Sequence, residues 1–176
     1  MKQNFTDLQD KDKTKQYEAF HNIIEAIKEP VDWAYEVWDE LVSGLTSKDN
    51  HTRSRTAQFL AYLAISDPDK RILEDFPKLW QVTKDEKFVT ARHSLQAIWR
   101  VGLAGVAQKE LLTSHLIERF KECENEKNYT LIRFDIIQDF KNLYDVLEEE
   151  QLKETALELI ELETDDKYRK KYTKIW

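Results

Sequence analysis

The sequence predicts an all-α chain, and three observations support this prediction. Glycine and proline number only three each among 176 residues, too few for the many turns of a β-sandwich or a β-barrel. Charged residues make up 35% of the chain, and the apolar residues between them recur every three or four positions, as on one face of a helix. Similar segments also recur roughly every forty residues, which is the period of helical-hairpin solenoids.

Three glutamines mark the repeated segments: Gln58, Gln96 and Gln138. In each segment an apolar residue directly precedes the glutamine, a second follows it by two positions and a third by five. Because an α-helix turns about 100° per residue, these apolar positions lie on one side of the helix and the glutamine points away from them. Each segment is therefore predicted to be a helix with one buried face and one exposed face.

The N-terminal part of the chain predicts a tail followed by two helices. Residues 1–12 are polar and show no periodicity, so we expect a flexible tail or a frayed helix start there and a single helical-repeat domain over residues 13–176. The first helix begins at residue 13 and ends before Pro30, because proline disfavours a helical conformation in the residue before it. The second begins near Val31, and its apolar residues share one face.

Short polar turns separate the remaining helices. The first glutamine helix covers residues 51–65. Ser66, Asp67 and Pro68 then combine a capping side chain with a proline in the first turn, which predicts a new helix start. Pro77 lies inside that helix and is expected to kink it. The further helices predicted are residues 88–101, a segment that includes 112–123, residues 129–147, residues 149–162 and a short last helix after residue 164.

Composition argues against several classes of partner and location. The net charge of −7 and the isoelectric point of about 5.2 weigh against nucleic-acid binding, which needs a basic surface. The longest apolar run, residues 59–65, is far shorter than the roughly 20 residues that cross a bilayer, so we expect no membrane partner. The first residues lack the apolar stretch of a signal peptide, and the single cysteine, Cys123, cannot form an internal disulfide. We therefore expect a cytoplasmic protein.

The turns between the helices give the chain a resemblance to the HEAT-repeat, or armadillo-like, superhelical family. Each repeat of that family pairs an outer helix with an inner helix and carries an Asp in the turn and an Arg at the start of the inner helix. The residues that match this pattern are Asp49, Arg55, Asp85, Arg92 and Arg133. The resemblance covers roughly residues 31–147. It implies a right-handed α-α superhelix of about three helical hairpins with terminal capping helices.

The resemblance also gives the acidic and basic turn residues a role. In this family the Asp and Arg of neighbouring turns pair and hold the stack together. Asp49, Arg55, Asp85, Arg92 and Arg133 are thus candidates for a structural ladder. A row of phosphate-binding arginines is the alternative, because a guanidinium group can bind phosphate through two hydrogen bonds.

The exposed faces of the three glutamine helices predict where a ligand could bind. Residues three before and four after each glutamine lie next to it on the helix surface. In a solenoid of this type the inner helices line the concave face, which is the usual binding surface. An ordinary solvated face is the alternative. The candidate binding residues are Arg55, Gln58, Tyr62, His93, Gln96, Arg100, Asp135, Gln138 and Asn142.

The sequence specifies no reaction. No two of the four histidines are spaced by four residues and no cysteine accompanies them, so we expect no metal. A glycine-rich loop and a nucleophile elbow are both absent, and we expect no cofactor. We predict a non-enzymatic scaffold whose concave face binds a protein or peptide. The resemblance leaves two alternatives: a DNA-repair enzyme similar to the alkylpurine DNA glycosylases of this architecture, which would use Asp135, and a binder of a small phosphorylated ligand.

Overall fold

The computed structural model describes all 176 residues and contains ten α-helices and no strand, so the all-α prediction is confirmed. The α-helices are α1 (Lys2–Asp7), α2 (Lys13–Ala26), α3 (Ala34–Gly44), α4 (Asn50–Leu63), α5 (Arg71–Val82), α6 (Phe88–Ile98), α7 (Val106–Glu122), α8 (Tyr129–Leu147), α9 (Glu150–Glu161) and α10 (Asp166–Thr173). Three short 3-10 helices extend α4, α6 and α7: η1 (Ala64–Ser66), η2 (Trp99–Leu103) and η3 (Cys123–Asn125).

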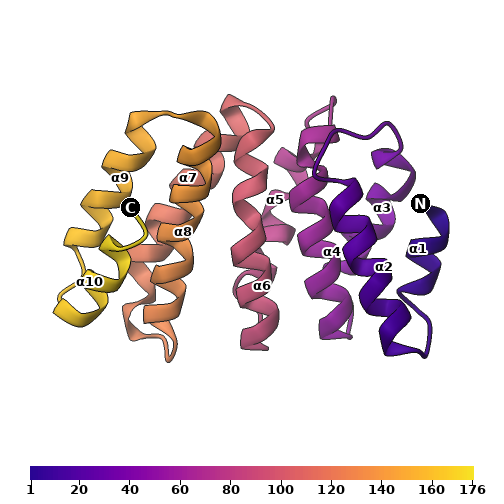
Figure 1. Ribbon diagram of the computed structural model, residues 1–176, viewed down its shortest axis with the longest axis horizontal. Coiled ribbons are helices and arrows are strands. Elements are labelled where there is room, and N and C mark those ends of the chain that lie inside the picture. Colours follow the sequence, from indigo (N-terminus) through magenta and orange to yellow (C-terminus); the bar gives the residue numbers. More distant parts are fainter.

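The helices form two layers that run the length of the molecule (Figure 1). The even layer consists of α2, α4, α6, α8 and α10, and each of these helices packs against the next. Behind it, α3, α5, α7 and α9 form the odd layer. Three consecutive hairpins, α3–α4, α5–α6 and α7–α8, each contribute one helix to each layer. The N-terminus lies near one end of the row and the C-terminus near the other (Figure 1).

One continuous core of 37 buried apolar residues extends from Leu8 to Tyr172. Burying one leucine or isoleucine side chain contributes roughly 1.5–3 kcal/mol, so this core accounts for the stacking of the hairpins. No helix combines the length and the apolar character needed to cross a bilayer. The core contains all the positions that the glutamine spacing assigns to buried faces: Ala57, Leu60, Leu63, Leu95, Ile98, Val101, Ile137, Phe140 and Leu143.

Aspartate side chains determine where several helices begin. Each of α2, α4 and α10 is preceded by an aspartate whose carboxylate accepts a hydrogen bond from a backbone N–H of the first turn. These aspartates are Asp12, Asp49 and Asp165. The buried carboxylate of Asp67 accepts hydrogen bonds from the backbone N–H groups of Arg71 and Ile72. As a result α5 begins at Arg71, three residues later than the helix predicted from Pro68.

Residues 1–12, where the sequence leaves a flexible tail and a frayed helix start as alternatives, contain helix α1, which packs along α2. The ring of Phe5 meets the rings of Trp33 and Phe59 edge to face, with centroids 6.1 and 5.9 Å apart. The side chain of Leu8 is buried. Phe5 and Leu8 are the only large apolar residues of this segment after Met1, and two positions are too few to show helical periodicity.

Candidate functional site

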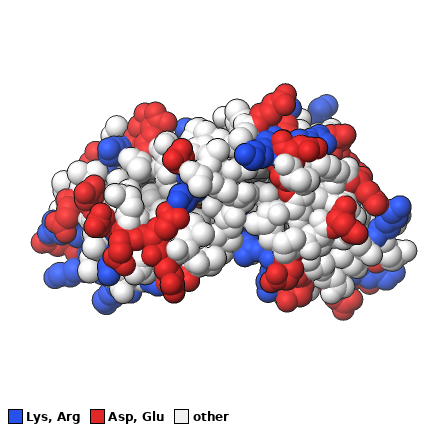
Figure 2. All heavy atoms as spheres, turned by 90° about the horizontal axis from the view of Figure 1, so that it is seen from above, with Lys and Arg blue, Asp and Glu red and all other residues white.

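A groove of about 490 Å³ lies on the even layer, where α2, α4 and α6 meet. Figure 2 views the molecule with the even layer along its lower edge, and the outline is hollowed in the middle of that edge. Seven of the nine lining side chains are polar or charged, and the other two are aromatic. The lining residues are Lys13, Gln16, Tyr17, Phe20, His51, Ser54, Arg55, Gln58 and His93.

Arg55 fixes α2 as one wall of the groove. Its Nη1 donates a hydrogen bond to the carbonyl oxygen of Leu8 at 3.0 Å, and its Nη2 donates to Oε1 of Gln16 at 2.7 Å. These bonds join the middle of the even layer to the N-terminal helices. Next to it, Nε2 of Gln58 donates to the carbonyl oxygen and the hydroxyl of Ser54, at 3.1 and 3.2 Å, so this amide is held against its own helix.

Arg100 lies in η2, just after α6, and packs against Tyr62 in the last turn of α4. The Arg100 guanidinium lies 4.5 Å from the centroid of the Tyr62 ring and 5.2 Å from that of Trp99, distances at which a cation and an aromatic face attract each other. Nη2 of Arg100 also donates to the carbonyl oxygen of Lys28, just after α2, at 2.8 Å. The same three segments that form the groove, α2, α4 and α6–η2, therefore meet again at Arg100.

The other candidate residues lie outside the groove. Asp135 is only 2% exposed, and both of its oxygens are occupied: Nε of Arg92 lies 2.9 Å from Oδ2, and Nε2 of Gln96 lies 3.1 Å from Oδ1. Gln138 donates to Oδ1 of Asn142, one turn further along α8, at 3.0 Å. The nine candidates are thus divided, and three of them, Arg55, Gln58 and His93, line the groove.

The repeat pattern does not identify most of the lining, because it treats α2 only as a capping helix. Lys13, Gln16, Tyr17 and Phe20 all come from α2, which carries no glutamine at the repeat position. One signal could have found them. In a two-layer stack, the helix before the first complete hairpin must cover the open side of α4, and the residues of α2 that face α4 then line the same surface.

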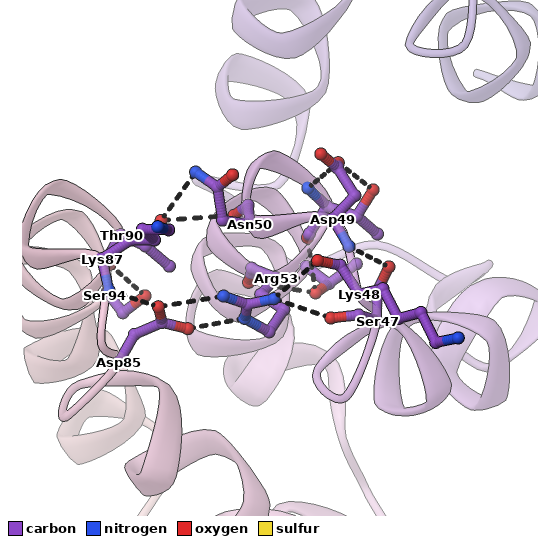
Figure 3. A network of polar contacts seen from close by, with 11 residues as sticks. Ser47, Lys48, Asp49, Asn50, Arg53, Asp85, Lys87, Thr90 and Ser94 are labelled. Atoms are coloured by element: carbon purple, nitrogen blue, oxygen red, sulfur yellow. Dashed lines mark hydrogen bonds and ion pairs between the residues drawn. The ribbon is translucent and has the colours of Figure 1, made fainter.

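Ion pairs connect successive even helices, and the first of them is drawn in Figure 3. Nε and Nη2 of Arg53, on α4, lie 2.6 and 3.0 Å from the carboxylate of Asp85 in the turn before α6. Nη1 of Arg53 donates to the carbonyl oxygen of Ser47 at 2.8 Å, so one guanidinium joins two turns (Figure 3). Arg133, on α8, makes the equivalent pair with Glu163 in the turn before α10, with Nη1 and Oε2 2.9 Å apart.

The middle of this ladder has a different pattern. Asp85, Glu126 and Glu163 each lie three residues before the first residue of α6, α8 and α10. Glu126 nevertheless pairs with Arg119 of its own hairpin. Arg92, which a regular ladder would pair with Glu126, binds Asp135 directly on α8. The central link is therefore made between two helices rather than between a helix and a turn.

The predicted ladder differs from these contacts at its first two members. Asp49 caps α4 and accepts hydrogen bonds from the backbone N–H and the hydroxyl of Thr52. Arg55 points to α2, and it is Arg53 that reaches Asp85. Two residues of helix correspond to about 200° of rotation, so Arg53 and Arg55 face opposite directions. The other predicted members, Asp85, Arg92 and Arg133, all take part in ion pairs.

Replacing Asp85 with asparagine is expected to lower the free energy of unfolding by about 1–3 kcal/mol at pH 7, because the charge-assisted bonds of Arg53 are lost. The hydrogen bond from Arg53 lowers the pKa of the Asp85 carboxyl below its ordinary value of 3.8, although burial opposes this. The Arg53–Asp85 pair therefore stabilises the folded protein fully at pH values above 3.8, the ordinary pKa of the carboxyl. This stabilisation disappears as the pH falls through the lowered pKa of the folded state.

Urea denaturation of the wild type and of Asp85→Asn between pH 7 and pH 3 measures this effect. The exposed Asp32, which makes no ion pair or side-chain hydrogen bond, provides the matched control Asp32→Asn. A loss of stability at pH 7 that stays constant down to pH 3 would contradict the assignment.

Other reactive groups are not assembled into a site. No three His, Cys, Asp or Glu side chains lie close enough together to hold a metal ion. Burial raises the pKa of the Cys123 thiol, which keeps it protonated. Trp38 and Trp80 are buried, while Trp99 lies against Arg100 and Trp176 against Tyr144. The groove on the even layer is therefore the arrangement of side chains best suited to binding.

Comparisons with known proteins leave this groove as the main guide to function. No family model matches the chain, and no curated protein is detectably similar to it in sequence.

Proposed function

We propose that this protein is a non-enzymatic scaffold of HEAT-like hairpins that binds a segment of another protein in the groove between α2, α4 and α6. The succession of α3–α4, α5–α6 and α7–α8 in two layers supports the repeat architecture. In such solenoids one layer provides an extended surface for partners. The groove lies on the layer that contains all three glutamine helices.

The observation that carries the proposal is the make-up of the groove. Its side chains come from three separate helices, and they mix aromatic rings with hydrogen-bonding groups. Aromatic anchors surrounded by polar groups are typical of surfaces that bind proteins and peptides. Tyr17 contributes most to this character, because it is an aromatic side chain that is 66% exposed.

The internal contacts of the arginines favour a scaffold over a row of phosphate sites. Arg92 and Arg133 bind carboxylates within the chain. A phosphate at either of the two would have to displace or share a carboxylate partner. The carboxylate of Asp135, which a glycosylase-like reaction would use, is likewise occupied by Arg92 and Gln96.

A photocrosslinking amino acid tests the proposal in cells of the source organism. Placed at His51, in the groove, it is expected to crosslink one predominant protein, because this exposed side chain faces the bound segment. Placed at Lys121, an exposed position on α7 in the odd layer, it is expected to give no such product. The double substitution Lys13→Glu/His93→Glu is expected to suppress the His51 product.

Two results would count against a binding groove. One is crosslinking from His51 and Lys121 to the same set of proteins. The other is a His51 product that the double substitution leaves unchanged.

A further inference from the structure

Two arginines of this protein lack a carboxylate partner, and both lie where α2, α4 and α6 meet. Of the eight arginines in the sequence, six form an ion pair with an Asp or Glu of the chain. The two exceptions are Arg55 and Arg100. Their hydrogen bonds go to neutral acceptors, the carbonyl oxygens of Leu8 and Lys28 and the amide oxygen of Gln16.

The groove that Arg55 lines contains no carboxylate, although the chain has 34 Asp and Glu residues and a net charge of −7. Arg100 lies beyond this lining, where η2 meets the end of α2. Lys13 adds a second fixed positive charge to the lining, and His51 and His93 add imidazole groups. At the Arg100 end, the nearby carboxylate of Glu25 is paired with Lys28. The groove is therefore a cationic region on an otherwise acidic protein.

Building on the proposed binding function, we infer that the bound segment is acidic and extended, with two carboxylates three to six residues apart. Arg55 marks one carboxylate position and Arg100, stacked on Tyr62, marks the other. Arg55 and Tyr62 are seven residues apart on α4, a rise of about 10 Å, whereas the partners of the two arginines, Gln16 and Lys28, are twelve residues apart, a rise of about 18 Å. An extended chain advances about 3.3 Å per residue, so these separations correspond to roughly three to six residues.

The aromatic residues of α2 suit the residues between the two carboxylates. Tyr17 and Phe20 line the groove within about one turn of Gln16, which marks the Arg55 end of α2. They offer apolar surface and no further charge. A segment with acidic residues at both ends and an apolar or aromatic residue between them would complement both features of the lining.

A nucleic acid fits this region less well. Strong binding of a polyanion relies on many lysines and arginines that displace counterions along the backbone. Here three such side chains, Lys13, Arg55 and Arg100, lie at or beside the groove, and the protein as a whole has a net charge of −7. Two discrete cations are better matched to two discrete carboxylates, each of which can accept hydrogen bonds from a guanidinium group.

Selection from a library of random displayed peptides tests the chemistry of the groove whatever the natural partner is. Panning against the wild-type protein is expected to enrich peptides with two Asp or Glu residues three to six positions apart. Parallel panning against Lys13→Glu/His93→Glu, which places negative charge at two exposed lining positions, is expected to lose this enrichment. Enriched peptides without paired acidic residues, or no enrichment over the bare support, would overturn the inference.

Fluorescence anisotropy with the selected peptide then tests the two arginines. Arg55→Gln and Arg100→Gln are each expected to weaken binding about 10- to 100-fold, the usual effect of losing hydrogen bonds to a charged group. The matched control Lys121→Glu, on the odd layer, is expected to leave the affinity unchanged. Replacing both peptide carboxylates with amides is expected to abolish binding, and raising the NaCl concentration is expected to weaken it.

Thermal unfolding of each variant separates a lost contact from a lost fold, because Arg55 also holds the N-terminal helices. If Arg55→Gln unfolds, the Lys13→Glu variant tests instead whether the groove binds an acidic peptide. Its affinity for the selected peptide is expected to fall about five-fold. Affinity that is indifferent to Lys13→Glu, or equal affinity for a single-stranded DNA oligonucleotide, would overturn the inference. A crosslinked partner at His51 together with acid-free selected peptides would leave the binding function standing and refute only the acidic ligand.

Discussion

Replacing Arg133 with methionine is expected to lower the free energy of unfolding by about 3–5 kcal/mol, the largest loss for any single ion pair of this protein. Arg133 is 4% exposed and its partner Glu163 is 1% exposed, so both charges lie out of water. Without the guanidinium group, the Glu163 carboxylate would be left buried with no opposite charge. Most of the loss comes from that uncompensated charge rather than from the bond itself.

The surroundings of Arg133 explain why no other group can take over its role. Its Nε donates to the carbonyl oxygen of Phe120 at 3.1 Å, and its guanidinium lies 4.7 Å from the centre of the Phe120 ring. The second oxygen of Glu163 accepts a hydrogen bond from the backbone N–H of Asp165 at 3.0 Å. The pair therefore fixes the end of α7, the start of α8 and the turn before α10 in one cluster.

A double-mutant cycle in urea at pH 7 measures this effect. Glu163→Gln combined with Arg133→Met is expected to be more stable than Arg133→Met alone, because no uncompensated charge then remains buried. The pair Arg169–Asp166 is exposed, and Arg169→Met is the matched control, with an expected change below about 1 kcal/mol. Equal losses for the buried and the exposed pair would show that burial is not the cause.

Replacing Asp139 with asparagine is expected to have the opposite sign and to stabilise the protein by about 1–3 kcal/mol at pH 8. Asp139 is 1% exposed, and its Oδ2 has no hydrogen-bond partner. Burial, followed by the negative charge of Asp135 one turn earlier on α8, raises the pKa of Asp139 well above its ordinary value of 3.8. A neutral side chain of the same shape avoids the cost of burying this charge.

The pH dependence of this effect has a definite sign. The folded protein keeps a proton on Asp139 at pH values where the unfolded chain has lost it, so the native state binds more protons. Stability is then lost as the pH rises from about 4 through the raised pKa. The gain from Asp139→Asn should be largest at pH 8 and vanish near pH 4, as measured by thermal and urea unfolding. A gain that is independent of pH, or one shared by the exposed control Asp32→Asn, would contradict this account.

The sequence predicts the faces of the helices better than it predicts their polar contacts. The spacing around Gln58, Gln96 and Gln138 identifies nine buried positions because burial depends on rotation about the helix axis, which the sequence determines directly. Ion pairs depend in addition on the length of each turn. Arg53 and Arg55 both lie near the start of α4 and face opposite directions, and the placement of the next turn decides which of them meets Asp85.

The groove, too, could be predicted only in part from the sequence. Arg55, Gln58 and His93 could be proposed from the repeat, because they lie on glutamine helices. The opposite wall, from α2, could not be proposed in the same way. Its position depends on contacts between distant segments, which include the bonds from Arg55 to Leu8 and Gln16 and the packing of Phe20 against Phe59, and no local pattern encodes them. The burial of Asp139 is equally hard to predict, since an isolated aspartate in a helix is usually exposed.

Arg55 attaches the N-terminal helices to α4. As a result, the docking of α1 and α2 is thermodynamically linked to the binding of a ligand in the groove. A ligand that requires the α2 wall stabilises the docked arrangement, and by reciprocity any change that loosens α1 lowers the affinity for that ligand. Phe5 does not line the groove, so loss of its packing against Phe59 would act on the ligand from a distance. Binding of a ligand in the groove should thus slow amide hydrogen exchange in residues 2–8, although those residues do not line the groove.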